Sequence, residues 1–168
     1  LIKPKKTSVC AGNIATSEAA KFLVRLGVDI IKVGIGPGSI CTTRLVAGIG
    51  VPQLSAILAV RNGLKNKKVK IISDGGIKYS GDLAKAFAAG ADAVMIGSLF
   101  SKAFESPGWT TTWWSKLRGK PPVKSYRGQA SKEFQLDNRG FVSGAPEGVT
   151  AKPQHPEYSL QQIVAQLE

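Results

Sequence analysis

Short apolar runs alternate with segments of helical character along residues 7–97, and this alternation restricts the possible folds more than any other feature of the sequence. The apolar runs lie at residues 7–10, 29–33, 69–73 and 92–96, and helices are expected near residues 16–26, 53–63 and 81–89. Strands that are apolar on both faces are typical of parallel sheets covered by helices. A doubly wound sheet and a (β/α)₈ barrel both have this order of elements.

Polar or glycine-rich residues follow each apolar run, and their positions favour the barrel. They are Asn13, residues 34–39, residues 74–76 and residues 97–98. The loops after the strands of a (β/α)₈ barrel converge on one face, where the active sites of such enzymes lie. We therefore predict an α/β fold of the TIM (β/α)₈ barrel type. A whole barrel needs about 250 residues and this chain has 168, so it is expected to cover roughly strands 5–8, with the first four strands upstream of residue 1.

Three segments of different character follow from the same pattern. Residues 1–104 are expected to form the C-terminal half of the barrel. Residues 105–158 are rich in Pro, Gly, Lys and Trp and lack periodicity, which predicts a mobile flap or insert. Residues 159–168 (SLQQIVAQLE) resume a helical pattern and are expected to start the terminal barrel helix.

Charge and composition exclude some classes of function. The formal net charge is +12, but the basic residues are spread along the chain without aromatic interleaving. We interpret them as a solvated surface that attracts anionic substrates, with no nucleic acid as primary ligand. No apolar run approaches the roughly 18 residues of a membrane helix, so no membrane association is expected. Two cysteines cannot support a disulfide framework, and a reduced, cytoplasmic setting is the default.

The segment VGIGPGSICTTR, residues 33–44, carries the densest chemical signal. Its glycines allow sharp backbone turns, although their spacing matches a dinucleotide-binding fingerprint only weakly. Cys41 follows in a tight loop beside the hydroxyl groups of Thr42 and Thr43, which suits a thiol that attacks an electrophilic carbon. The alternative is a buried structural cysteine, the commonest fate of a free thiol.

Four segments together resemble the IMP dehydrogenase/GMP reductase family. They are GIGPGSICTTR at 34–44, SDGGIKYSGDLAKAFAAGADAVMIGSL at 73–99, KSYRG at 124–128 and PEGV at 146–149. The resemblance is strong from residue 7 to about 135 and looser beyond. It implies that Cys41 attacks C2 of a purine 5′-monophosphate, GMP or IMP, and forms a covalent adduct while hydride moves between that carbon and NADPH or NAD.

The same resemblance assigns the remaining site residues. Thr43 is implied as the activating hydroxyl and Glu133 as a catalytic carboxylate. Gly34 and Gly36 would contact the cofactor, while Gly36, Gly38 and Cys41 would bind a monovalent cation such as K⁺. A homotetramer is the implied assembly. The implied nucleotide-binding residues are Ser39, Asp74, Gly76, Gly97, Ser98, Tyr126, Gly128 and Glu147. Taken alone, Asp74 could cap a turn, Tyr126 could belong to a core, and Glu147 could be a solvated loop acid.

The segment SKEFQ, residues 131–135, bears on which reaction is catalysed. Dehydrogenases of the family carry an Arg-Tyr pair before Phe-Gln, and that arginine activates water. Here Lys132 and Glu133 occupy those positions, which favours GMP reductase, converting GMP and NADPH to IMP and ammonia. KSYRG and PEGV look more like a dehydrogenase, so IMP dehydrogenase, converting IMP, NAD and water to XMP and NADH, is the alternative. A non-catalytic nucleotide-binding homologue is a further alternative.

Overall fold

The computed structural model describes residues 7–64, 68–109, 116–119, 121–128, 131–142, 148–154 and 156–168. The chain divides into two compact units. The first unit comprises residues 1–37 and 49–96, and the second comprises residues 38–48 and 97–168.

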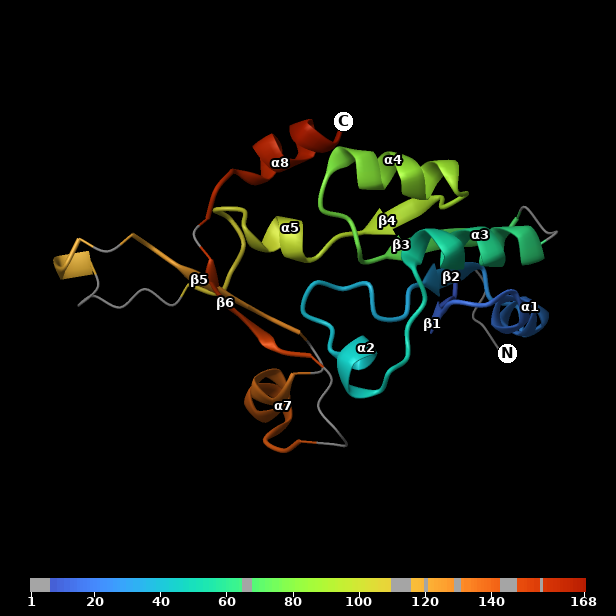
Figure 1. The fold of residues 1–168 in the computed structure, drawn as a ribbon, viewed down its shortest axis with the longest axis horizontal. Coiled ribbons are helices and arrows are strands. Elements are labelled where there is room, and N and C mark those ends of the chain that lie inside the picture. Colours follow the sequence, from blue (N-terminus) through green and yellow to red (C-terminus); the bar gives the residue numbers. More distant parts are fainter. Residues whose placement is uncertain are drawn as a thin grey trace. The chain divides into compact units, whose positions relative to one another are not determined.

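A parallel four-stranded sheet forms the centre of the first unit (Figure 1). Its strands are β1 (Cys10–Ile14), β2 (Ile30–Val33), β3 (Lys70–Asp74) and β4 (Ala93–Met95), paired in chain order. The predicted parallel neighbours are therefore confirmed, and their carboxyl ends share one edge of the sheet.

The first strand is displaced from the predicted position. Residues 7–10 were expected to form it, whereas the observed strand β1 runs from Cys10 to Ile14. Gly12 allows β1 to pair closely with β2. A Cβ atom at Gly12 would lie 2.4 Å from the carbonyl oxygen of Lys32, so only glycine lets the two strands run this close. Cys10, in turn, is exposed within the first unit.

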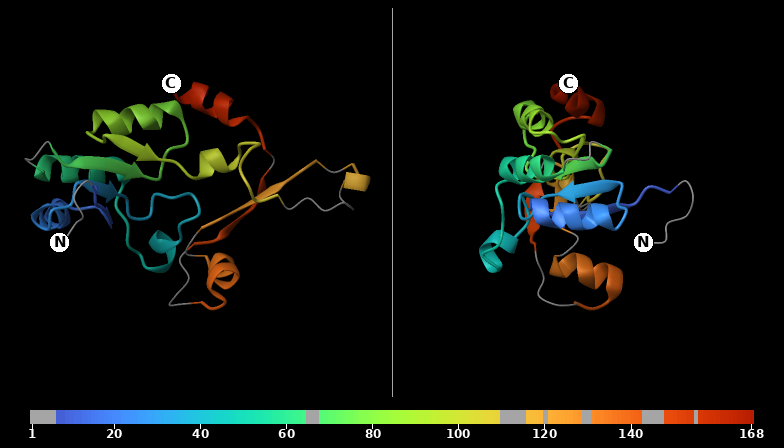
Figure 2. Two further views of the ribbon diagram at one scale, coloured as in Figure 1. Left: turned by 180° about the vertical axis from the view of Figure 1, so that it is seen from behind. Right: turned by 90° about the vertical axis from the view of Figure 1, so that its right-hand side faces the viewer.

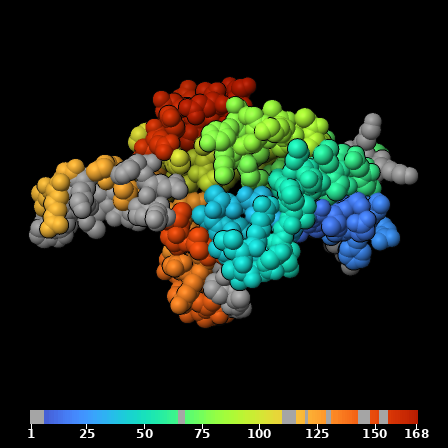
Figure 3. Space-filling view, in the orientation of Figure 1, coloured from blue at the N-terminus to red at the C-terminus, as the bar shows by residue number. Residues whose placement is uncertain are grey.

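Three helices connect these strands and lie along one side of the sheet (Figure 2). They are α1 (Ser17–Arg25), α3 (Gln53–Gly63) and α4 (Ser80–Ala88). The side chain of Thr16 accepts a hydrogen bond from the backbone N–H of Ala19 and caps α1. Helices α3 and α4 form one continuous surface in the space-filling view (Figure 3). Strand residues such as Ile31 and Ile71 are fully buried beneath them together with Ile57 and Val60 of α3.

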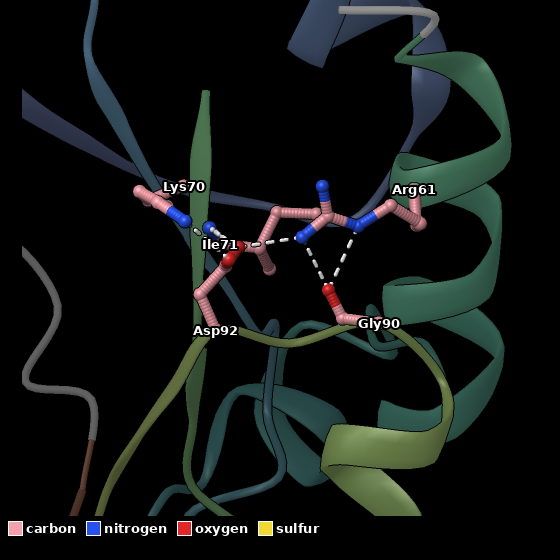
Figure 4. Close-up of polar contacts among 5 residues, drawn as sticks. All are labelled: Arg61, Lys70, Ile71, Gly90 and Asp92. Carbon is pink, nitrogen blue, oxygen red and sulfur yellow. Dashed lines mark hydrogen bonds and ion pairs between the residues drawn. The ribbon is translucent and has the colours of Figure 1, made fainter. Parts of the chain in front are cut away.

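A polar network ties the amino-terminal ends of β3 and β4 to helix α3 (Figure 4). The Arg61 guanidinium donates to the carbonyl oxygen of Gly90, with 2.8 Å between Nε and O, and pairs with the Asp92 carboxylate. Asp92 also accepts the backbone N–H of Ile71 at 2.9 Å and pairs with Lys70 at 3.0 Å. Burial acts to raise the pKa of Asp92, but these donors outweigh it and the pKa lies below its usual value.

The second unit contains short elements around an antiparallel hairpin. The strands are β5 (Lys124–Arg127) and β6 (Thr150–Gln154), and the helices are α2 (Thr43–Val46), α5 (Ser98–Ser101), α7 (Lys132–Arg139) and α8 (Leu160–Leu167). The expected helix near the C-terminal end is confirmed as α8, which Ser159 caps. Residues 105–158 were expected to lack regular structure, yet they contain β5, α7 and β6. Their mobility stays a prediction. Of the helices that the structure describes, none is long and apolar enough to cross a membrane.

Candidate active site

The cysteine loop places a thiol beside a hydroxyl group. Cys41 Sγ lies 3.1 Å from Thr43 Oγ1, within hydrogen-bonding distance for sulfur, and both residues are half-buried. The turn that carries the thiol is closed by a hydrogen bond of 3.1 Å from the Cys41 N–H to the Gly38 carbonyl oxygen. Thr43 then begins helix α2, which fixes its backbone. The two residues predicted to act together in the loop are thus adjacent, and Ser39 is exposed at its start.

Residues more than a hundred positions later in the chain hold this loop. The Gly148 N–H donates to Thr42 Oγ1 at 2.7 Å, and the Val149 N–H donates to the Ile40 carbonyl oxygen at 3.1 Å. At Gly128, an added Cβ atom would lie 3.3 Å from the Ile40 side chain. Gly148 and Val149 of the PEGV segment therefore contact the cysteine loop directly, and Gly128 of KSYRG lies next to Ile40. Glu147 lies outside the described residues.

Gly97 and Tyr126, both predicted to bind the nucleotide, meet in the second unit. A Cβ atom at Gly97 would lie 2.4 Å from the Tyr126 hydroxyl oxygen, so glycine is required for this approach. Ser98 follows as the first residue of α5 and is half-buried. A cavity of about 630 Å³, a volume typical of ligand sites, adjoins this contact. Its lining includes Gly97, Phe100, Ser125, Tyr126, Arg127 and Phe134.

Lys124 anchors the start of β5, two residues before Tyr126. Its side chain is buried, and its ammonium lies 4.4 Å from the centre of the Trp109 ring. It donates hydrogen bonds to the carbonyl oxygens of Ala103, Phe104 and Ser106. Burial lowers the pKa of Lys124, and the negative charge of Glu105 opposes that shift. The anchored lysine thus fixes the start of the strand that carries Tyr126.

Asp74 stands at the end of β3 in the first unit, where two side chains bind one of its carboxylate oxygens. Asn13 Nδ2 and Lys32 Nζ each lie 2.9 Å from Asp74 Oδ2. The same Asn13 amide donates to the Gly34 carbonyl oxygen at 2.8 Å. Sequence reasoning noted Asn13 only as a polar strand end and missed Lys32. A lysine inside an otherwise apolar strand was the signal that could have revealed it.

Packing explains one of the predicted cofactor-binding glycines. A Cβ atom at Gly34 would lie 2.3 Å from the carbonyl oxygen of Asp74, so a larger residue would push the strand ends apart. Gly76 has a positive φ of 83°, which suits glycine in the turn after β3. The cofactor-binding role of Gly34 and Gly36 and the cation site of Gly36, Gly38 and Cys41 stay predictions. No cluster of three or more metal-binding acids, cysteines or histidines occurs among the described residues.

Glu133 lies in the first turn of α7 and is exposed. Its carboxylate accepts a hydrogen bond of 3.2 Å from the Thr150 hydroxyl on β6. Arg127 of β5 fastens the same helix, since it pairs with Asp137 and lies 5.7 Å from the centre of the Phe134 ring. The helix that carries Lys132 and Glu133 is thus attached to both strands of the hairpin. The catalytic role of Glu133 stays a prediction.

Comparisons with known proteins agree on the family. The family model described as IMP dehydrogenase / GMP reductase domain matches residues 2–168. Inosine-5′-monophosphate dehydrogenase of Chlorobaculum tepidum is 54% identical over 150 residues, covering 89% of this chain and 29% of that protein. The enzyme of the same name from Bacillus subtilis is 45% identical over 165 residues, covering 95% and 34%.

A solved structure supports the predicted fold class as well. The crystal structure of GMP reductase from Trypanosoma brucei in complex with guanosine 5′-monophosphate matches with a TM-score of 0.83 and 42% identity. The match covers 95% of this chain and 32% of that one, and the chain spans about a third of the length of the relatives it matches. The prediction of a (β/α)₈ barrel fold, covered in part, is confirmed. With a family match over nearly its whole length, the chain belongs to the IMP dehydrogenase / GMP reductase family.

Proposed function

We propose that this protein is a purine nucleotide oxidoreductase that acts at C2 of a purine 5′-monophosphate through a covalent bond to Cys41. The contact of 3.1 Å between Cys41 Sγ and Thr43 Oγ1 carries the proposal. A hydroxyl at this distance can exchange a proton with the thiol, and the thiolate is the nucleophilic form of cysteine. The clamp from Gly148 and Val149 holds the loop in one geometry, which an attacking group needs.

We propose GMP reductase as the activity. Cys41 Sγ forms a bond to C2 of GMP, and the bond from C2 to the amino group breaks as that group takes a proton and leaves as ammonia. A nicotinamide cofactor, NADPH in this direction, supplies the hydride that C2 then receives. The bond between sulfur and C2 breaks last, which returns the electron pair to Cys41 and releases IMP. The whole reaction consumes GMP, NADPH and one proton and yields IMP, NADP⁺ and ammonia.

The first turn of α7 favours the reductase over the dehydrogenase. Loss of ammonia requires a proton donor near the amino group, and Glu133 supplies a carboxyl group for this step together with Thr43. Hydrolysis of the adduct to XMP would require a base, and Lys132 replaces the arginine of the dehydrogenases at this point.

IMP dehydrogenase is the second candidate. The relatives from Chlorobaculum tepidum and Bacillus subtilis both bear that name, at 54% and 45% identity. In this reaction Cys41 attacks C2 of IMP, hydride leaves to NAD, and water releases XMP. Both reactions pass through the same adduct, because loss of ammonia from GMP and loss of hydride from IMP leave an identical group on sulfur.

Nucleotide-binding roles are proposed for individual residues, as the family resemblance implies them. Asp74 would accept hydrogen bonds from ribose hydroxyls. Gly97, Ser98 and Tyr126 would surround the phosphate with backbone N–H and hydroxyl donors. Gly34 and Gly36 are proposed to contact the nicotinamide cofactor, as the family resemblance implies. K⁺ and a homotetrameric assembly belong to the proposal on the strength of the family alone.

The test is a pair of assays on the full-length protein that contains this sequence. NADPH oxidation with GMP should release ammonia in equal amount, while IMP with NAD should yield little XMP. Production of XMP at an ordinary enzymatic rate, about 1 s⁻¹ or more, would replace the reductase by the dehydrogenase. No reaction in either assay, with nucleotide still bound, would point to the non-catalytic homologue.

A pair of variants tests whether the Glu133 carboxylate takes part in the release of ammonia. Glu133→Gln should remove the GMP reaction because the proton donor is lost. Glu157→Gln is the matched control, since Glu157 is an exposed acid whose carboxylate pairs with Lys102. An unchanged GMP reaction in the Glu133 variant would exclude this residue from ammonia release.

A further inference from the structure

The two oxygens of the Asp74 carboxylate have different surroundings. Oδ2 accepts from both Asn13 Nδ2 and Lys32 Nζ, each at 2.9 Å. Oδ1 receives no hydrogen bond from any residue that the structure describes. The Asp74 side chain is 23% exposed. One oxygen is therefore held by the protein and the other is available to a ligand.

A β-bulge brings Asn13 into this contact. Gly12 pairs with Lys32 and Ile14 pairs with Val33, so Asn13 is an extra residue in β1 without a partner in β2. Bulges of this kind redirect a side chain and are over-represented beside active sites. The redirected amide crosses to β3, where it binds Asp74, and its second hydrogen bond to the Gly34 carbonyl fixes its orientation.

Strand register brings Lys32 to the same oxygen. Lys32 pairs with Ile72 of β3, and Asp74 lies two residues further along that strand. Side chains two residues apart point to the same face, so the ammonium of Lys32 reaches along the face to the carboxylate. Three neighbouring strands thus each contribute one side chain to a polar cluster at the carboxyl edge of the sheet. The members of this cluster are Asn13, Lys32 and Asp74.

We propose that Asn13 and Lys32 are positioning residues that hold Asp74 Oδ2, so that Oδ1 faces the ribose hydroxyl groups of the nucleotide. This inference rests on the proposed function, because it concerns the nucleotide site named there. A carboxylate fixed through one oxygen loses little freedom when the other accepts a hydrogen bond from ligand. The two residues therefore set how strongly the protein distinguishes a ribonucleotide from its deoxy analogue.

A separate contact also joins two of these strands. Gln53 of α3 braces β2 and β3, since its Nε2 atom donates to the Val33 carbonyl oxygen at 2.7 Å and to Ser73 Oγ at 3.0 Å. Val33 and Ser73 are fully buried. Removal of Asn13 or Lys32 should therefore leave the ends of β2 and β3 in place while the Asp74 side chain gains freedom.

The experiment compares the affinities of GMP, 2′-deoxy-GMP and 3′-deoxy-GMP for the full-length protein, measured by calorimetry. The wild-type protein should bind at least one deoxy analogue about tenfold more weakly than GMP, which corresponds to ~1.4 kcal/mol. In Asn13→Leu and Lys32→Met that ratio should fall to about threefold or less, because the misplaced carboxylate no longer favours the hydroxyl. Lys32→Arg should restore part of the ratio.

Lys70→Met is the matched control, because Lys70 also pairs with an aspartate but stands at the opposite end of β3. Its ratio should equal that of the wild type. Equal weakening of GMP and both analogues in the Asn13 and Lys32 variants would reveal a merely structural role and overturn the inference, as would an unchanged ratio. Should Asn13→Leu fail to fold, the same affinity ratio can be measured with Asn13→Ala. Failure of the wild-type protein to bind GMP or IMP would instead refute the proposed function, whereas wild-type binding without discrimination refutes only the role of Asp74.

Discussion

Different interactions stabilise the interior of each of the two units. Nearly all fully buried apolar side chains of the described residues, such as Ile31, Ile57 and Ile71, belong to the first unit. In the second unit, the described buried apolar residues are only Ala103 and Ile163, and three polar residues are buried as well. These are Lys124, Ser131 and Gln135.

The two kinds of interaction differ in how strictly they fix the positions of side chains. Apolar burial is proportional to area and tolerates small shifts of position. Hydrogen bonds and ion pairs depend on distance and angle, and one lost partner leaves the other uncompensated. The second unit, which carries Cys41 and Tyr126, is therefore expected to lose function on substitution before the first unit loses its fold.

The largest effect is expected at the thiol. Cys41→Ala should lower turnover by about a thousandfold or more while nucleotide affinity changes little, because the covalent bond exists only during reaction. Steady-state kinetics and calorimetry on the full-length protein measure both. Cys10→Ala is the control, since Cys10 is exposed in the first unit and should retain full activity. Retention of substantial turnover without Cys41 would exclude covalent catalysis.

Core truncation compares the stability of the two units. Ile71 and Ile163 are both fully buried, one in the central sheet and one in α8. Ile71→Ala should lower the free energy of unfolding by ~3–5 kcal/mol and Ile163→Ala by ~2 kcal/mol, within the range for such cavities. Denaturant titration gives the values. A larger loss at Ile163 would show that the second unit has the more rigid core.

A single methyl group should disturb the site without unfolding it. Gly97→Ala places a Cβ atom 2.4 Å from the Tyr126 hydroxyl oxygen, so the tyrosine must move. Nucleotide affinity should fall about tenfold, as expected for one lost hydrogen bond to a charged group, with little change in the melting temperature. Gly81→Ala is the control, because nothing lies within 4 Å of its added Cβ atom. Equal affinities for the two variants would remove Gly97 and Tyr126 from the nucleotide site.

The smallest effect should come from the network in Figure 4, and it should depend on pH. The pKa of Asp92 is lowered from 3.8 in the folded state, so its charged form stabilises the fold above that pH. As the pH falls through the lowered pKa, this contribution is lost. Asp92→Asn should therefore cost about 1 kcal/mol at neutral pH, and its stability should converge on that of the wild type below pH 3.8. A difference that persists in acid would assign the effect to packing.

Sequence reasoning located the first unit better than the second, and the reason is physical. Strands β2 to β4 and their helices were predicted from local apolar patterns, and the same apolar residues form the core of the first unit. The hairpin of β5 and β6 is formed by pairing across more than twenty residues, and α7 is largely polar, so neither leaves a local periodic signal. The contacts of Lys32 and Asn13 with Asp74 depend on strand register, which the sequence does not reveal.

The central claim is that Cys41 bonds to C2 of the purine, and mass spectrometry tests it most directly. The full-length protein would be incubated with IMP and NAD, and in parallel with GMP and NADP⁺, then quenched in acid and digested. In both samples the peptide that contains Cys41 should carry the mass of the same purine nucleotide adduct, and the peptide that contains Cys10 should be unmodified. Turnover accompanied by an unmodified Cys41 peptide, or by an adduct on another residue, would contradict the account.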